Sequence, residues 1–424
     1  AETKTWPAKK DEPVLFLGEW CKRFSKRELW ENLDSEVLEY HWNDRKKLAS
    51  DYKYLQQLYE ILLISLSKKL NEVHSCNYSI RYWRILVGPW LGMFVHILFD
   101  RWTGIKEALK DPTVNKCIIF DRDPLTLIPN GMLEFENLYK EDGWNELIYS
   151  QLLQEHLPGK VNLIKIPYRE RTSRSNKTLK KDLFFKIKYL LKQGVKLLAR
   201  ISPGNPKFFF LSSRLPLKEE IFLQIALRQF PRIWRSSKIL SVDPNIIERK
   251  WNLDVSKNSA DLFEEIALRF IPIHLPTCYL EGYKDLLKQM KKQNWPSKPK
   301  VIFTATADIA DDVFKMYASQ NIELGSSLVI AQHGGHYGTS HFYFTEDHQI
   351  NISDKWLSWG WNDIKRPKIH PVGKIDGAIH KAYDRNGKAL MVGCAFSRFS
   401  YYLYAVPIAS QWLYYFDDQK NFIK

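Results

Sequence analysis

The sequence is short of cysteine and of the motifs that identify several large enzyme classes. Its five cysteines are scattered, odd in number and free of C-x-x-C spacing, which argues against a disulfide framework or a zinc ribbon. Reduced thiols of this kind are typical of a cytoplasmic protein. No Walker A, G-x-G-x-x-G, G-x-S-x-G or H-E-x-x-H motif is present, which excludes P-loop NTPases, standard dinucleotide enzymes, serine hydrolases and zincins. The most apolar run, residues 85–99, is too short to span a bilayer and contains Pro89 and His96.

Positive charge is in excess, with 63 Lys and Arg residues against 48 Asp and Glu residues and a net charge of +15. An anionic partner is therefore expected, namely a nucleotide-activated substrate, a lipid phosphate surface or a nucleic acid. The densest basic segment, residues 169–181, fits a solvated loop and a membrane or phosphate contact equally well. Because the cations are dispersed and no recognised nucleic-acid motif is present, nucleic acid is not the expected partner.

Short apolar strands alternate with helical stretches, which predicts an α/β fold built on a parallel sheet. The clearest helix is residues 51–74, and residues 79–109 are expected as a helical pair kinked near Gly88-Pro89. These helices form a large insertion, at about residues 45–110, between strands. Further helices are predicted at residues 180–198, 218–230 and 309–319. Strands are predicted within residues 13–20, 117–120, 161–166, 208–211, 301–304 and 328–332.

A second pattern begins after a connecting region at residues 356–373. Residues 389–394 are a predicted strand and residues 405–423 a predicted helix, which together make the first βα unit of another sheet. We therefore expect residues 1–375 to form an N-terminal Rossmann-like domain with the helical insertion. Residues 386–424 would begin a second Rossmann-type, donor-binding domain. Since the chain ends within a helical pattern, we expect a piece of a longer protein that is inactive by itself.

The most informative segment is the run Gln332-His333-Gly334-Gly335-His336-Tyr337-Gly338, which follows a predicted buried strand. A strand that ends in His-Gly-Gly can turn tightly and brings bare backbone N–H groups beside an imidazole. Such a turn suits a phosphate, which His333 or His336 would bind or protonate as it leaves. Gln332, Gly334 and Gly335 are the expected phosphate-binding residues. The alternative is a glycine-rich turn with a structural histidine.

Two other strand ends carry candidate residues, since ligands of open α/β sheets bind at the carboxyl ends of the strands. Glu19 closes the first strand and is placed to take a proton from a sugar hydroxyl, although a helix cap or a salt bridge explains it equally well. Ser397 and Arg398 precede the last predicted helix, where a helix dipole and a guanidinium suit a donor phosphate. A solvent-facing arginine is the alternative for Arg398.

Neither a metal nor another cofactor is expected. His333, His336 and His341 could converge on a metal ion, but no Asp, Glu or Cys at ligand spacing supports such a site. The turn Asp121-Arg122-Asp123 is a weak match to an acid/base or metal pair. Three further aspartates lie at a predicted helix start, where carboxylates stabilise the helix dipole without a catalytic role: Asp308, Asp311 and Asp312.

Five segments stand out for tryptophan and glycine: residues 16–21 (FLGEWC), 30–33 (WENL), 40–42 (YHW), 81–92 (RYWRILVGPWLG) and 332–338 (QHGGHYG). Together they resemble a family of transferases encoded in bacterial surface-polysaccharide loci, over nearly the whole chain. The resemblance implies a two-Rossmann (GT-B) transferase of lipopolysaccharide or capsule assembly. The His-Gly turn is similar to those of capsule Kdo transferases and of teichoic acid glycerophosphotransferases.

By analogy with GT-B enzymes, the resemblance implies a role for each candidate residue. Glu19 would lie on the acceptor side, His333 and His336 would approach the donor phosphate, and Ser397 with Arg398 would begin the donor domain. The expected protein is a glycosyltransferase, cytoplasmic and peripheral at the inner face of the cell membrane. It would use a nucleotide-activated sugar, with a CMP-linked acidic sugar as one candidate, and a glycan or lipid-linked acceptor. Two alternatives stay open: a CDP-polyol or glycerol phosphotransferase, and a non-enzymatic basic protein that binds anionic membrane or nucleic acid.

Overall fold

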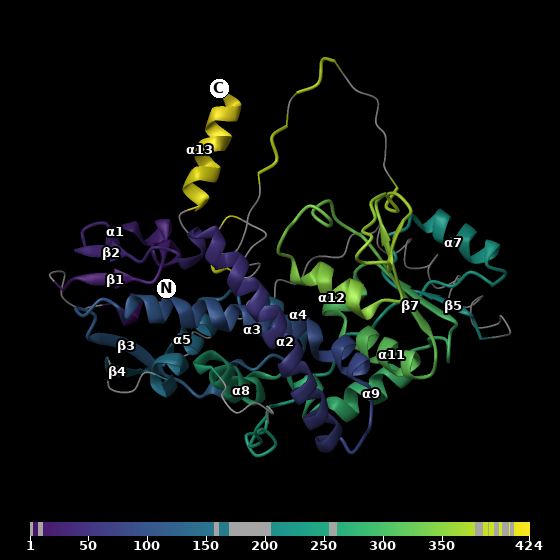
Figure 1. Cartoon of the computed structure of the whole chain (residues 1–424), viewed down its shortest axis with the longest axis horizontal. Helices are drawn as coiled ribbons and strands as arrows, with labels where there is room; N and C mark the ends of the chain where they lie inside the picture. Colours follow the sequence, from purple (N-terminus) through teal and green to yellow (C-terminus); the bar gives the residue numbers. More distant parts are fainter. Residues whose placement is uncertain are drawn as a thin grey trace, which may run out of the picture.

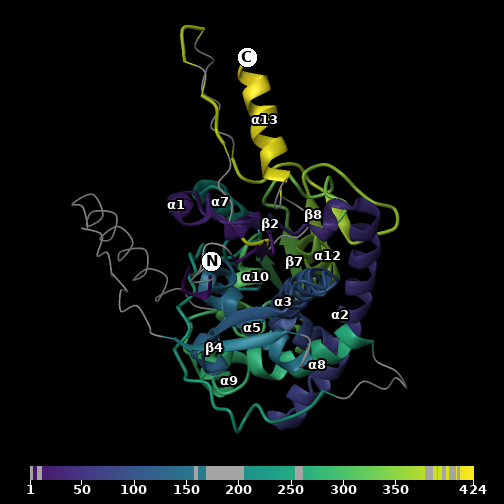
Figure 2. The ribbon, with the colours of Figure 1, turned by 90° about the vertical axis from the view of Figure 1, so that its left-hand side faces the viewer.

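The computed structural model describes residues 3–6, 12–156, 161–168, 205–253, 261–377, 385–388, 390–393, 398–400, 407 and 411–424. In this part of the chain, helices pack around three separate parallel sheets (Figure 1). The long helices α2 (Arg45–Val73) and α3 (Ile80–Ala108) run through the middle of the molecule. Two small sheets lie on one side of them and a five-stranded sheet on the other (Figures 1 and 2).

The described strands are short and belong to these three sheets. They are β1 (Val14–Phe16), β2 (Ser35–Val37), β3 (Lys116–Asp121), β4 (Asn162–Pro167), β5 (Phe208–Phe210), β6 (Val301–Thr304), β7 (Ser327–Ala331), β8 (Lys355–Ser358) and β9 (Ile369–Pro371). Besides α2 and α3, the described helices are α1 (Arg27–Trp30), α4 (Met132–Leu138), α5 (Asp142–His156), α7 (Leu217–Ala226), α8 (Leu262–His274), α9 (Tyr283–Lys291), α10 (Ala307–Ala310), α11 (Asp312–Glu323), α12 (Phe344–Ile352) and α13 (Gln411–Ile423).

The strands do not form the single sheet that the sequence predicts. β1 pairs with β2 and β3 with β4, whereas β5 to β9 follow one another in chain order in a third sheet. All of these pairs are parallel; Val329 of β7, for example, lies between Phe303 of β6 and Lys355 of β8. The mixed α/β class with parallel pairing is therefore confirmed. The two-Rossmann arrangement and the division into two domains stay predictions.

Two predictions about individual elements are wrong. Residues 80–108 form one helix, α3, rather than a pair of helices, because neighbours on several sides support the turn that Pro89 weakens. These neighbours are α2, α5, α8, α11 and α12. The connecting region predicted at residues 356–373 contains β8 and β9, and the indole of Trp356 in β8 is fully buried.

Helix α3 is long and apolar enough to cross a membrane, but 94% of its most apolar 18-residue window is buried inside the protein. It therefore has the environment of a core helix. Its N-terminus is capped by Ser79, whose hydroxyl accepts a hydrogen bond of 3.2 Å from the Tyr82 N–H. Its partner α2 begins earlier than predicted, at Arg45, because the Asp44 carboxylate caps the N–H groups of Lys46 and Lys47.

Near the carboxyl end the structure describes only parts of the predicted βα unit. Residues 390–393 belong to no strand, and the side chains of Leu390 and Val392 are exposed, so the predicted strand is absent from the residues described there. Helix α13 lies within the predicted helix at residues 405–423. The basic segment at residues 169–181, the helix predicted at residues 180–198 and Ser397 lie outside the described residues.

Candidate functional site

The candidate site lies where β5, β6 and β7 end. Since these strands are parallel, their carboxyl ends meet at one edge of the five-stranded sheet. The segments that follow them contribute Arg214, Ala305 and His333, respectively. His333 is half-buried there and has a hydrogen bond with the backbone of Ala305. Its ring also interacts electrostatically with the guanidinium of Arg214. Three segments that are far apart in the sequence therefore form one site.

His333 is a neutral imidazole in this environment. Burial, followed by the charges of His336 and Arg214, lowers the pKa of His333 to about 4, although the hydrogen bond with Ala305 acts in the opposite direction. The hydroxyl of Tyr337 lies 3.4 Å from each of its ring nitrogens. At pH 7 the ring can accept a proton or donate its one N–H to an oxygen, but it carries no charge of its own.

Arg214 supplies positive charge at this edge and was missed in the sequence analysis. It is exposed, and it has neither a hydrogen bond nor an ion pair with any other described residue. Its φ of 63° lies in the left-handed region, as does the φ of 51° at Ser212. Two non-glycine residues with this conformation after one strand indicate a strained turn, a feature common at functional sites. An arginine four residues after a strand of three phenylalanines was a usable signal in the sequence.

Gln332 anchors the His-Gly turn to the rest of the protein. Its side-chain oxygen accepts hydrogen bonds of 2.9 Å from the backbone N–H of Trp359 and from the indole N–H of Trp361. Its side-chain nitrogen donates a hydrogen bond of 2.7 Å to the carbonyl of Gly334. The side chain is buried, so this residue positions the turn from behind.

The two glycines of the turn leave its outer side open. The backbone N–H groups of Gly334 and Gly335 have no acceptor among the described residues. A Cβ atom built on Gly335 would have no heavy atom within 4 Å. His336 is exposed beside them, and its ring stacks on Tyr337 with 4.6 Å between centroids. Free N–H groups next to an imidazole and a guanidinium can hold an anion such as a phosphate.

Glu19 lies far from this turn. It follows β1 as the first residue of the short helix η2 (Glu19–Cys21) and is exposed. β1 and β7 lie in opposite halves of the molecule (Figure 1). The structure therefore does not bring Glu19 together with His333 and His336.

Arg398 lies near Glu19 rather than near the His-Gly turn. Its guanidinium donates a hydrogen bond of 2.5 Å to the carbonyl of Trp20 in η2 and forms an ion pair with Asp142 of α5. Asp142 also pairs with Arg23 at 3.2 Å. Among the candidate residues, the structure thus brings Arg398 to η2, whereas Gln332, His333, Gly334, Gly335 and His336 form a separate group.

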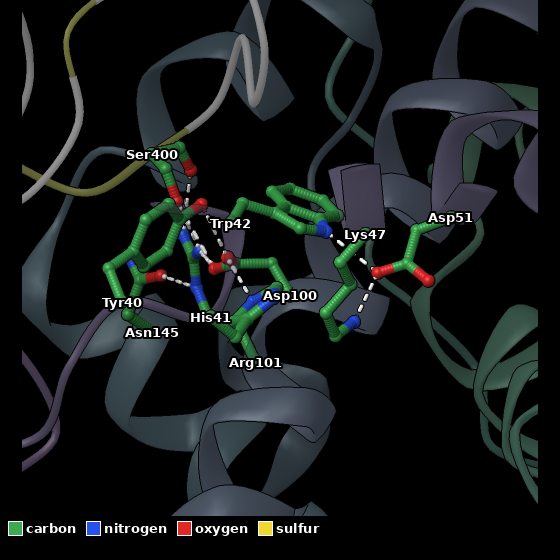
Figure 3. A network of polar contacts seen from close by, with 9 residues as sticks. All are labelled: Tyr40, His41, Trp42, Lys47, Asp51, Asp100, Arg101, Asn145 and Ser400. Carbon is green, nitrogen blue, oxygen red and sulfur yellow. Dashed lines mark hydrogen bonds and ion pairs between the residues drawn. The ribbon is translucent and has the colours of Figure 1, made fainter. Parts of the chain in front are cut away.

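A buried polar network lies close to η2 and Arg398, on the other side of the molecule from the His-Gly turn (Figure 3). The Asp100 carboxylate accepts hydrogen bonds from the Tyr40 hydroxyl at 2.8 Å and from the Ser400 hydroxyl at 3.1 Å, and it pairs with His41 at 3.1 Å and with Arg101. Burial alone would raise the pKa of Asp100, but Arg101, His41 and Tyr40 outweigh it and lower this pKa to about 2. The guanidinium of Arg101 also donates a bond of 2.9 Å to the carbonyl of Ser400.

This network connects the segment 398–400 to the helical core, because Ser400 forms hydrogen bonds with Asp100 and Arg101, which belong to α3. The Nδ1 atom of His41 is buried and has no hydrogen-bond partner in the described part of the chain. The hollow beside it measures about 10 Å³, room for no more than one water molecule. The network therefore has a structural role in this conformation.

The remaining candidates form no metal cluster. Within the described ranges, no group of three or more His, Cys, Asp or Glu side chains is placed to hold a metal ion. Asp123 caps a short helix by accepting a hydrogen bond from the Leu125 N–H, and Asp311 caps α11 in the same way. Asp312 pairs with Lys315 at 2.8 Å in the core. Asp308 is buried, and burial raises the pKa of Asp308 to about 6.

Fold and site together define an α/β protein with a glycine-rich turn, bearing free N–H groups, at the edge of a parallel sheet. Comparison with known protein families adds the reaction class. The model of the LIC12162 family transferase matches residues 1–424, so the chain belongs to this transferase family. No curated protein and no solved structure matches the chain.

Proposed function

We propose that this transferase moves a sugar from a nucleotide-activated donor to a bacterial surface glycan, such as lipopolysaccharide or capsule. The observation that carries the proposal is the group at the carboxyl edge of the five-stranded sheet: the neutral imidazole of His333, the Arg214 guanidinium and the open N–H groups of Gly334 and Gly335. A nucleotide donor presents phosphate oxygens that these groups suit. The choice of acceptor rests on the resemblance to surface-polysaccharide transferases.

In the proposed reaction, the oxygen of an acceptor hydroxyl forms a bond to the anomeric carbon of the sugar. The bond between that carbon and the phosphate oxygen breaks, and the nucleotide leaves with the electron pair. Arg214 and the amides of the turn stabilise the negative charge that develops on the phosphate. His333, being neutral, takes the hydroxyl proton, or donates a hydrogen bond to the phosphate when another base takes it. Glu19, at the end of β1 in the other half of the molecule, is too far from this turn to be that base in the conformation described.

A CDP-linked polyol or glycerol phosphate donor would use the same turn, with the bond breaking at phosphorus instead of carbon. The two reactions differ in their products, because only the second leaves a phosphate on the acceptor. Mass spectrometry of the product separates them.

The test is turnover by the whole protein. UDP-, GDP-, dTDP- and CMP-sugars and CDP-glycerol are each incubated with the wild type, His333→Ala and the matched control His341→Ala, an exposed histidine just beyond the turn. The proposal expects one donor to be consumed by the wild type and the control, and at least about tenfold more slowly by His333→Ala. If no donor is consumed, or if His333→Ala matches the wild type, the proposal fails.

A further inference from the structure

Helix α7 exposes its apolar side chains and buries a polar one. Gln224 is the one side chain of α7 that is fully buried, with an exposed fraction of 0%. In contrast, Phe222 is 65% exposed and Ile225 is 55% exposed. The Gln224 side chain forms two hydrogen bonds with the backbone of Arg232. Its oxygen accepts one of 2.9 Å from the Arg232 N–H, and its nitrogen donates one of 3.0 Å to the Arg232 carbonyl. This is the reverse of the usual helix of a soluble domain, whose apolar stripe faces the core.

The exposed apolar side chains continue beyond α7, and we call the whole set the α7 surface. It consists of Leu217, Phe222, Leu223, Ile225, Phe230 and Ile233. Single exposed apolar residues are normal on protein surfaces, but six within 17 positions of one segment indicate an interaction surface for a protein, a membrane or a ligand.

The charges around the α7 surface indicate what it binds. Arg214, Lys218, Arg228 and Arg235 are exposed at its borders. Of the two acidic residues in α7, Glu219 is exposed, whereas Glu220 accepts a hydrogen bond of 2.5 Å from the hydroxyl of Ser213, so the four exposed cations outnumber the acidic residues. An apolar face with a cationic border is typical of helices that lie in the interface of an anionic bilayer. A second copy of the chain would bring like charges together, because each copy carries a net charge of +15.

The position of α7 links this surface to the candidate site. α7 follows β5 through the turn that contains Arg214, and it projects at the outer end of the molecule beyond β5 (Figure 1). A bilayer in contact with the α7 surface would therefore lie near the edge of the sheet that carries His333.

We propose that the α7 surface docks this protein on an anionic phospholipid membrane, with Phe222 and Ile225 inserted and with Lys218, Arg228 and Arg235 on the lipid phosphates. Resting on the proposed function, this gives the acceptor's class: a glycan joined to a lipid and presented at the membrane surface. The soluble donor would reach the His-Gly turn from the water side.

The test measures binding of the complete protein to vesicles of phosphatidylcholine with and without phosphatidylglycerol. The wild type should bind the anionic vesicles, and binding should weaken as salt rises. The double variant F222E/I225E should lose at least about tenfold in affinity, because each charge must be taken into the interface. The matched control is Ile364→Glu, a side chain that is 97% exposed in the loop before β9 and far from α7 in sequence.

Each other outcome overturns the proposal. In the first, the wild type does not bind anionic vesicles. In the second, F222E/I225E binds them as tightly as the control does. In the third, the wild type is a dimer and the double variant is a monomer. A loss of thermal stability in F222E/I225E with unchanged vesicle binding would mean that protein covers α7. Binding of a soluble nucleotide should be the same in F222E/I225E and wild type, so failure of the docking surface and failure of the transferase assignment are distinguishable.

Discussion

The guanidinium of Arg398 donates a hydrogen bond of 2.5 Å to the backbone carbonyl of Trp20, a residue 378 positions earlier in the chain. Together with the ion pair between Arg398 and Asp142, this contact places the segment 398–400 against the N-terminal strands and helices. The carboxyl-terminal part of the chain therefore contributes to the structure around η2, where Glu19 lies.

Replacing Arg398 with alanine should increase local opening of η2, with only a small loss in the unfolding free energy of the whole protein. The Arg398 side chain is 33% exposed, so the loss in unfolding free energy should be about 1 kcal/mol. Hydrogen exchange of the backbone N–H groups of Cys21 and Lys22, which bond within this turn, should become faster. The control is Lys420→Ala, which removes an exposed ion pair with Asp417. Unchanged exchange at Cys21 in Arg398→Ala would contradict this role.

Asp100→Asn should be far more damaging than Ser400→Ala, although both remove contacts of the same network. The first change leaves the guanidinium of Arg101 buried without its counter-charge, which costs about 3–5 kcal/mol in unfolding free energy. The second removes a single hydroxyl and should cost about 1 kcal/mol. Urea denaturation of both variants measures the difference. Equal losses would mean that the Asp100–Arg101 pair adds no more than a neutral hydrogen bond.

Two glycines of the His-Gly region should respond differently to replacement by alanine, one in stability and the other in nucleotide binding. Gly338 has a φ of 76°, and its Cβ would come within 2.7 Å of the Trp361 ring, so Gly338→Ala should lose about 1–3 kcal/mol of stability. Gly335 has open space around it, so Gly335→Ala should change stability by less than about 0.5 kcal/mol. It should nevertheless weaken nucleotide binding, because the new methyl group enters the space of the phosphate. Nucleotide binding by Gly335→Ala equal to that of the wild type would argue against a ligand on this side of the turn.

Stability should fall as the pH drops from 7 to 5, because three histidines are buried in neutral form. Burial lowers the pKa values of His96, His274 and His348 to about 3. Below a pH of about 6.5 the unfolded chain therefore binds protons that the folded chain does not, and each histidine lowers the unfolding free energy by up to about 1.4 kcal/mol per pH unit. Asp308 acts in the opposite direction below pH 6, because burial raises its pKa to about 6 and the folded chain then takes up the extra proton.

His348→Leu tests this pH dependence directly. Neither ring nitrogen of His348 has a hydrogen-bond partner among the described residues, so the change removes a proton-binding group without breaking a hydrogen bond. The melting temperature of this variant should fall less between pH 7 and pH 5 than that of the wild type. Parallel curves for the two proteins would show that His348 is protonated equally in the folded and unfolded states.

The sequence predicts the strands in the middle of the large sheet, which are mostly buried. β6 has the bounds predicted for it, and β7 is displaced by one residue, because both are short apolar runs within the sheet. β8 and β9 were missed, since their tryptophan- and proline-containing sequences are equally typical of loops and β9 is an edge strand. The separation into three sheets depends on contacts between distant segments, which local patterns do not report.

The same limit applies to the candidate site. The His-Gly turn could be found because its residues are adjacent in the sequence. Arg214 joins it only through the parallel pairing of β5, β6 and β7, which the sequence does not specify. The buried network of Asp100 and Arg101 was missed for another reason, since two adjacent charges in an apolar helix give no sign of which partners neutralise them.

The central claim, that a phosphate binds between Arg214 and the His-Gly turn, is tested most directly by calorimetric titration with CMP, CDP, UDP and GDP. The complete protein should bind at least one of these nucleotides, and Arg214→Ala should weaken that binding by about tenfold or more while His341→Ala leaves it unchanged. Binding that is equally strong in Arg214→Ala, or no binding of any nucleotide by the wild type, would contradict the claim.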